Sequence, residues 1–201
     1  MQNQSLARKM GIIGIIGSVL WVVAVIMQYS LNLVEPDEGV MGFVIELIFL
    51  TALAGVSVGF LGLIPGGAVA NTFGKTVVIL YAVSRALIIF GGLVGLFPQL
   101  QDSPVFVGFP IGGTLADISA LLIGIAVITA RRWNGWQRWM PLVHFLVLFF
   151  AVSLPLGLGM TPDGPGMAGE LVMGAMWLGV ALAVFTSAAN LRSYAAAAQP
   201  S

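Results

Sequence analysis

The chain has no cysteine, and among its 201 residues histidine occurs once, as His144. The lack of cysteine excludes disulfides, thiolate catalysis, iron–sulfur clusters and cysteine zinc sites. A single histidine cannot supply both axial ligands of a haem within one chain, nor a histidine-rich metal centre. The sequence therefore predicts no metal site and no cofactor.

Charge is also scarce. Charged residues make up 8% of the chain, and eight basic residues balance eight acidic ones. A soluble domain usually carries about a quarter charged residues. With a net charge of zero, no long-range field draws nucleic acid, so we expect no nucleic-acid partner. Hydrophobic residues reach 59% and the mean hydropathy is +1.03, which indicates an integral membrane protein whose main partner is the lipid bilayer.

The apolar residues form six runs, and each is long enough for a membrane-spanning helix of about 20 residues. Together they leave no room for a soluble domain. We expect one all-α domain over residues 1–201, a six-transmembrane-helix bundle built from three outward-turned hairpins. The runs cover residues 10–34, 41–64, 74–97, 106–130, 139–158 and 167–190.

The loops separate by sign. By the positive-inside rule, the basic helix ends face the cytoplasm. This predicts a plasma membrane protein with both termini on the cytoplasmic side. Trp133, Trp136 and Trp139 flank the fifth run on the basic side and are predicted to anchor it at the interface. The basic set is Arg8, Lys9, Lys75, Arg131, Arg132, Arg138 and Arg192; the opposing acidic set is Glu35, Asp37, Glu38, Asp102 and Asp163.

Two charges fall near the middle of neighbouring runs, Arg85 in the third and Asp117 in the fourth. Each costs about 2.5–3.5 kcal/mol at a helix centre on an insertion scale. Adjacent antiparallel helices bring opposite charges at one depth together. We therefore predict a buried Arg85–Asp117 ion pair.

Three further polar residues lie inside the runs. Glu46 and Glu170 are within about two turns of the outer ends of their helices, where Arg85 could reach either. Glu170 also suits the first turn of a helix, where the dipole favours an acid. His144 is a packing residue or a proton-relay step, because its charge can change near neutral pH.

Glycines at spacings of four predict close helix packing within the bundle, or a homodimer surface. Gly55 and Gly59 also frame Ser57 in a G-x-S-x-G pattern, which works in hydrolases only in a strained strand-to-helix turn. A serine hydrolase using Ser57 and His144 is thus a distant alternative. The packing glycines are Gly55, Gly59, Gly91, Gly95, Gly108 and Gly112.

Several local patterns resemble a bacterial six-span membrane family known as a domain of unknown function, of the 4386 type. The likeness covers nearly the whole chain. It implies the six-span architecture in a bacterial inner membrane and no assigned activity. It is carried by Arg8-Lys9 with the glycine-rich first run, Glu46, Tyr81 with Arg85, Arg131-Arg132 followed by Trp139-Met140-Pro141, and Glu170-Leu171.

These features leave two main interpretations of function. The first is an accessory or interaction protein, not an enzyme, in which a dry Arg85–Asp117 pair stabilises the bundle and the glycines dock a membrane partner or a second copy. The second is a carrier of a small solute, ion or proton, with an outward-facing cavity beneath the helix breaks at Pro110 and Pro155. A carrier would use Glu46, Arg85, Asp117, Glu170 and His144.

Overall fold

The computed structural model describes residues 2–33, 39–69, 71–100, 108–161 and 164–197. Within these ranges all regular structure is helical. The elements in chain order are α1 (Gln2–Ser30), α2 (Gly39–Leu61), α3 (Thr72–Gly95), the short 3-10 turn η1 (Pro98–Leu100), α4 (Gly108–Ala130), α5 (Trp136–Leu148), the π-helical segment η3 (Phe149–Ser153), α6 (Leu154–Gly157) and α7 (Gly166–Ala197).

Six helical stretches are long and apolar enough to cross a membrane, so the chain is a multi-pass membrane protein. The predicted number of spans is confirmed, with α5, η3 and α6 together forming the fifth. The first helix starts at Gln2, well before the apolar run, because its polar first turns pack on α7. Ala7 is fully buried there, and the Arg8 guanidinium lies 5.2 Å from the ring centre of Phe185.

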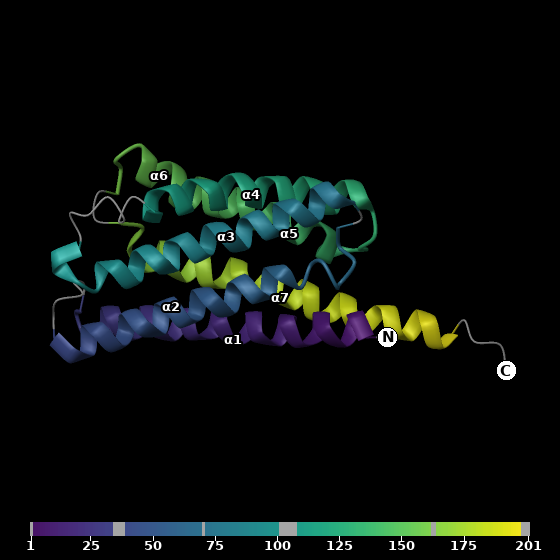
Figure 1. The fold of residues 1–201 in the computed structure, drawn as a ribbon, viewed down its shortest axis with the longest axis horizontal. Coiled ribbons are helices and arrows are strands. Elements are labelled where there is room, and N and C mark those ends of the chain that lie inside the picture. The colour runs from purple at the N-terminus through teal and green to yellow at the C-terminus, as the bar shows by residue number, and fades with distance from the viewer. Residues whose placement is uncertain (1, 34–38, 70, 101–107, 162–163, 198–201) are drawn as a thin grey trace.

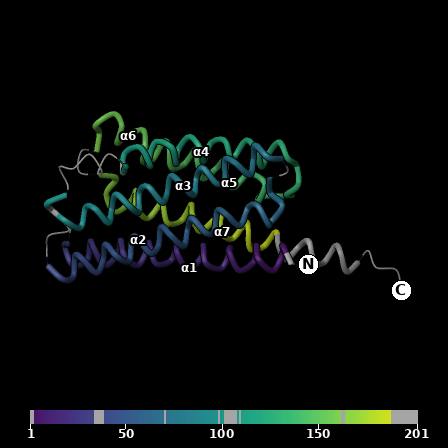
Figure 2. The backbone as a smooth tube through the Cα atoms, viewed as in Figure 1, coloured from purple at the N-terminus to yellow at the C-terminus, as the bar shows by residue number. Residues whose placement is uncertain are grey.

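The long helices form a closed ring in chain order. Each packs on its sequence neighbours, and α7 closes the ring by packing on both α5 and α1 (Figures 1 and 2). The helices alternate in direction, so the start of α1 and the end of α7 lie at the same end of the bundle (Figure 1). Helices α2 and α7 also contact each other across the ring. Side chains therefore fill its interior.

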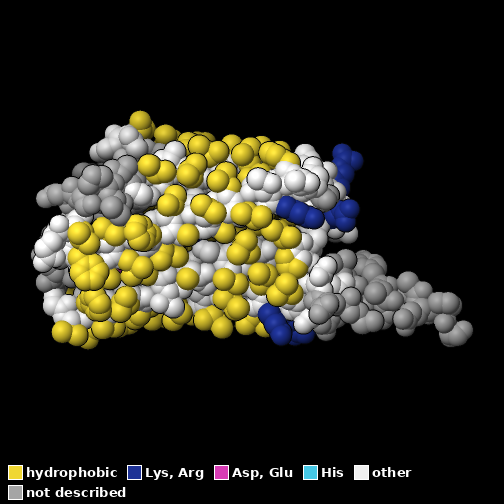
Figure 3. All heavy atoms as spheres, in the orientation of Figure 1, with side chains coloured by type: hydrophobic (Ala, Val, Ile, Leu, Met, Phe, Trp, Pro, Cys, Tyr) yellow, Lys and Arg dark blue, Asp and Glu magenta, His cyan; other side chains and the backbone are white. Residues whose placement is uncertain are grey.

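The outer surface carries a broad apolar belt, and lysine and arginine gather at one end of it (Figure 3). Large apolar side chains point outward along this belt, such as Ile16 at 54% and Phe150 at 61% exposure. An apolar surface of this extent is suited to lipid rather than water. The acidic loop residues of the sequence prediction, Glu35, Asp37, Glu38, Asp102 and Asp163, lie outside the described residues.

One of the three predicted interfacial tryptophans has a different role. Trp133 is buried, and its indole N–H donates a 3.0 Å hydrogen bond to the Gly66 carbonyl in the turn after α2. Trp136 and Trp139 are about half exposed, as an interfacial anchor would be. The prediction was wrong for Trp133 because charge patterning does not reveal the long-range contact between its loop and the α2–α3 turn.

Glycine lets α1 and α2 approach closely. A Cβ on Gly55 would lie 3.0 Å from the Gly17 Cα, and one on Gly59 would lie 2.8 Å from the Gly14 Cα. On α4, a Cβ on Gly112 would meet the Ser84 carbonyl of α3 at 2.8 Å. These three glycines thus lie at helix contacts inside the bundle.

The other predicted packing glycines differ. Gly108 is loosely packed, since a Cβ there would come no nearer than 3.9 Å to the Leu87 carbonyl. Gly91 is buried on α3, and Gly95 ends that helix. The tight contact in this region belongs to Gly92, where a Cβ would lie 2.6 Å from a Leu50 methyl of α2.

We predict that Gly17→Ala destabilises the protein by about 1–3 kcal/mol, because the added methyl overpacks a rigid contact. That methyl would lie 2.7–2.9 Å from backbone atoms of α2, which cannot yield without moving the helix. Thermal unfolding in detergent measures the effect. Gly113→Ala is the matched control, since a Cβ there meets nothing within 4 Å; equal melting temperatures for the two variants would contradict the packing argument.

Candidate functional site

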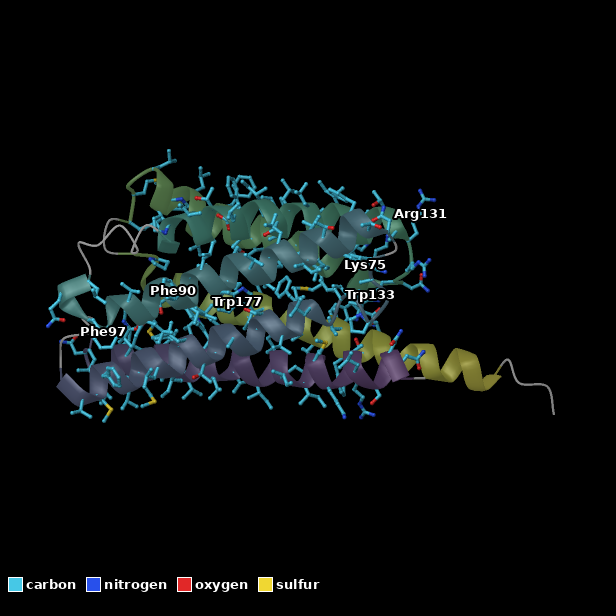
Figure 4. All side chains as sticks on the ribbon, viewed as in Figure 1. Lys75, Phe90, Phe97, Arg131, Trp133 and Trp177 are labelled. Atoms are coloured by element: carbon cyan, nitrogen blue, oxygen red, sulfur yellow. The ribbon has the colours of Figure 1, made fainter. Side chains whose placement is uncertain are left out.

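Large side chains from four helices meet in the interior of the ring. They are Phe60 of α2, Tyr81 and Arg85 of α3, His144 of α5 and Trp177 of α7, and we call these five residues the central cluster. The four rings are at most 2% exposed. In Figure 4, Trp177 lies midway along the bundle, whereas Trp133 lies near Lys75 and Arg131 at the basic end.

Aromatic rings contact the half-buried Arg85. The Arg85 Nη2 donates a 2.7 Å hydrogen bond to the Tyr81 hydroxyl, one helical turn away on the same face of α3. Its guanidinium carbon lies 4.9 Å from the ring centres of both Tyr81 and Trp177. A desolvated cation–π contact contributes about 2 kcal/mol. Two such contacts are of the size needed to offset the insertion cost of the charge.

The predicted direct Arg85–Asp117 ion pair is wrong. Among the described residues, the Arg85 guanidinium has its contacts with Tyr81 and Trp177 instead. The Asp117 side chain lies beside Ser153 and interacts with it, and it interacts with Arg85 only through space. The physical reason is distance. Tyr81 lies one turn away on the same helix and contacts the guanidinium directly, whereas the short Asp117 side chain extends from a neighbouring helix.

Ser153, which interacts with Asp117, belongs to the π-helical segment η3. In η3 the Leu154 N–H bonds the Phe149 carbonyl, five residues back rather than four. Pro155 follows at once and has no N–H to continue an α-helical pattern. Single π turns of this kind often occur at functional sites. Here the segment places the Ser153 hydroxyl beside the Asp117 carboxylate.

The only histidine is enclosed by the central cluster. His144 is 1% exposed, and its ring centre lies 5.1 Å from that of Phe60 and 6.4 Å from that of Tyr81. Neither ring nitrogen has a hydrogen-bond partner among the described residues. A neutral imidazole has one donor and one acceptor nitrogen, so His144 leaves both kinds of hydrogen-bonding group unsatisfied.

Two further buried nitrogens near His144 also lack a hydrogen-bond partner among the described residues. They are the Nε of Arg85 and the indole Nε1 of Trp177. The Trp177 and Tyr81 side chains lie close enough to interact as hydrogen-bonding groups, but the indole N–H does not reach the geometry of a hydrogen bond. These two donors and His144 all surround one tyrosine. Buried polar groups are nearly always satisfied in proteins, and each exception calls for an explanation.

Glu46 and Glu170 form a second polar level, which we call the outer carboxyl pair. The two side chains interact electrostatically with each other. A Glu46 oxygen lies 3.5 Å from the point where a Cβ on Gly92 would be, two turns beyond Arg85 on α3. On α7, Glu170 likewise lies two helical turns from Trp177. The outer carboxyl pair and the central cluster are therefore about 10 Å apart along the bundle.

Trp21 of α1 joins the outer carboxyl pair to the central cluster. Its indole N–H donates a 3.0 Å hydrogen bond to the Glu170 carbonyl, and its ring centre lies 4.8 Å from that of Trp177. No described set of three or more acidic or histidine side chains lies close enough together to hold a metal ion.

The G-x-S-x-G serine is not associated with the histidine. The Ser57 hydroxyl donates to the Leu53 carbonyl of its own helix at 2.7 Å. His144 has no hydrogen-bond partner in the part of the chain that the structure describes, which includes Ser57, so a Ser57–His144 bond is excluded. The flanking Gly55 and Gly59 lie against α1, and α2 continues without a turn through this motif.

The sequence analysis missed Phe60, Trp177 and Ser153. Trp177 had a usable signal. Tryptophan prefers the membrane interface, so one in the middle of a span is unusual. Tyr81 was noted beside Arg85 but given no role, although a spacing of four puts both on one helix face. Ser153 had no signal, since its orientation depends on the π turn.

Comparison with known proteins gives no relative. No protein-family model matches the sequence, and neither curated proteins nor solved structures contain a similar chain.

We predict opposite results for removing the indole N–H from two buried tryptophans. Trp133→Phe should lower the free energy of unfolding by about 1–3 kcal/mol, because the buried Gly66 carbonyl loses its donor. Trp177→Phe should cost less, because among the described residues its N–H makes no well-formed hydrogen bond that would be lost. Thermal unfolding of the purified variants makes the comparison; a Trp177→Phe loss larger than that of Trp133→Phe would show that its N–H is bonded.

Proposed function

We propose that the protein is a membrane carrier that binds a small polar solute or ion at the central cluster. The observation that carries this proposal is the set of unpartnered, buried nitrogens on Arg85, His144 and Trp177. Leaving a buried donor or acceptor unsatisfied costs about 1–3 kcal/mol. A residue set kept for stability alone would be replaced by apolar side chains of similar shape at little or no loss.

The accessory-protein interpretation loses its main argument. It rested on a dry, mutually satisfied Arg85–Asp117 pair, and the guanidinium lies on aromatic rings instead. The glycines that were candidates for docking a partner, Gly55 and Gly59, are occupied by α1 within the same chain. Binding and transport, rather than catalysis or scaffolding, is the function we assign.

The two polar levels suggest a route along the bundle axis. A solute would enter at the end of the bundle opposite to the lysines and arginines, reach Arg85 and Trp177, and then meet Tyr81 and His144 toward the basic end. Intramembrane charged groups of carriers face such wet paths. The π segment η3 and Pro155 form the least regular part of the ring and would supply the movement that opens the outer side.

We further propose that the basic end of the bundle faces the cytoplasm of a bacterium and that both termini lie there. Support comes from the arginines and lysines gathered at one end (Figure 3). A chain of six spans is short for a carrier, so a second copy is the partner we expect in the membrane.

The carrier proposal predicts water at the level of Asp117. The natural absence of cysteine allows single cysteines to be introduced cleanly at Gly113 and Ala120, four residues before and three after Asp117. A membrane-impermeant thiol reagent added from the outer side should label both, although Ala120 is only 3% exposed. Labelling is measured by the mass shift of the intact protein.

Ile118→Cys is the matched control, because Ile118 lies on the same helix and faces outward at 49% exposure. A lipid-facing thiol stays un-ionised and unreactive, so this variant should remain unlabelled. If Gly113→Cys and Ala120→Cys also remain unlabelled, the centre of the bundle is dry and the carrier proposal fails.

The orientation has its own test. Leu100→Cys, in the exposed turn η1, should react from outside intact cells. Asn3→Cys, exposed near the start of α1, should react only after the cells are opened. The reverse pattern would invert the topology while leaving the bundle unchanged.

A further inference from the structure

The hydrogen-bonding groups of the central cluster are unbalanced toward donors. Arg85 has five N–H groups and one described hydrogen bond, to the Tyr81 hydroxyl. Trp177 has one N–H, which makes no well-formed hydrogen bond among the described residues although the Tyr81 side chain lies beside it. Neutral His144 adds one further N–H and a single acceptor nitrogen. The nearby Asp117 carboxylate interacts with Arg85 through space, but among the described residues it accepts no hydrogen bond from the guanidinium.

From this imbalance we propose that the central cluster binds a small monocarboxylate anion, with its two oxygens accepting from the Arg85 Nε–H and the Trp177 indole N–H. The inference rests on the carrier function proposed above and names its substrate class. A carboxylate matches the planar, fixed geometry of a guanidinium edge, and charge-assisted bonds of this type are about twice as strong as neutral ones.

The charge of the site selects against a cation. Arg85 is permanently positive. Among the described residues its direct contacts are with Tyr81 and Trp177, and the Asp117 carboxylate acts on it only through space. A cation entering the central cluster would meet this charge and the unsatisfied N–H groups. Among the described residues, no set of three or more acidic or histidine side chains is grouped closely enough to coordinate a metal ion.

Large rings form the walls around the unpartnered nitrogens, so an occupant would have to be small. Phe60, Tyr81 and Trp177 are almost completely buried, and the Phe60 and Tyr81 rings stack with their centres 4.2 Å apart. Such walls suit a short apolar tail on a polar head. Acetate has this form and is the probe we choose.

The test measures acetate binding to the full-length protein in lipid nanodiscs by titration calorimetry. Wild type should bind acetate and should not bind acetamide, a neutral molecule of the same shape. Trp177→Phe keeps the aromatic wall and removes one N–H, so the affinity for acetate should fall about tenfold. Arg85→Lys removes the Nε–H and the planar fork, so its loss should be at least as large.

Trp136→Phe is the matched control, because it makes the same chemical change on an exposed tryptophan outside the central cluster. Its acetate affinity should equal that of wild type. The proposal is overturned if wild type does not bind acetate, if acetamide binds equally well, or if Trp177→Phe and Arg85→Lys bind acetate as wild type does.

Failure of this inference is distinguishable from failure of the carrier function. Labelled cysteines at positions 113 and 120 together with no acetate binding would mean that the water path exists and that only the monocarboxylate assignment is wrong. Unlabelled cysteines would instead remove the carrier function, whatever the calorimetry gives.

Discussion

The arrangement of this bundle depends on how a permanently charged guanidinium is accommodated inside a membrane protein. Arg85 is held between the rings of Tyr81 and Trp177 and bonded to the Tyr81 hydroxyl. Its two aromatic partners belong to α3 and α7, which are not neighbours in the ring of helices. The cation therefore ties opposite sides of the ring together across its centre, and α2 and α5 pack Phe60 and His144 against the same tyrosine.

Accommodating a cation with rings has a chemical consequence that a carboxylate partner would not have. A ring face attracts the positive charge but accepts few of the N–H bonds that the guanidinium offers. The Asp117 carboxylate, which could have accepted them, lies beside Ser153 and interacts with Arg85 only through space. The interior is thus compact yet has donors left over among the described residues. This combination distinguishes it from the dry ion pairs that lock helices together.

The sequence predicted the number and approximate limits of the spans because lipid imposes a simple length and composition rule. It also predicted that Arg85 and Asp117 would lie near each other, since that follows from depth on neighbouring helices. It could not predict which partner each would choose. The partners of Arg85 are Tyr81, one turn away on the same helix, and Trp177, on a helix that is distant in the sequence. The depth of a residue in the membrane predicts neither contact. Trp133 shows the same limit, since its partner Gly66 is 67 residues away along the chain.

The π segment η3 can be understood as a regular helix that carries one surplus residue. In an uninterrupted α-helix, Ser153 would point about 180° away from His144, nine residues earlier, and so away from the interior. The wider turn absorbs one position, which brings Ser153 to within about 80° of His144. The surplus lies on the outer side, where Phe150 and Ala151 are exposed. A homologue lacking one of these two residues would present the same serine to the interior from an ordinary helix, so a single-residue gap at this point of an alignment would preserve the interior rather than disrupt it.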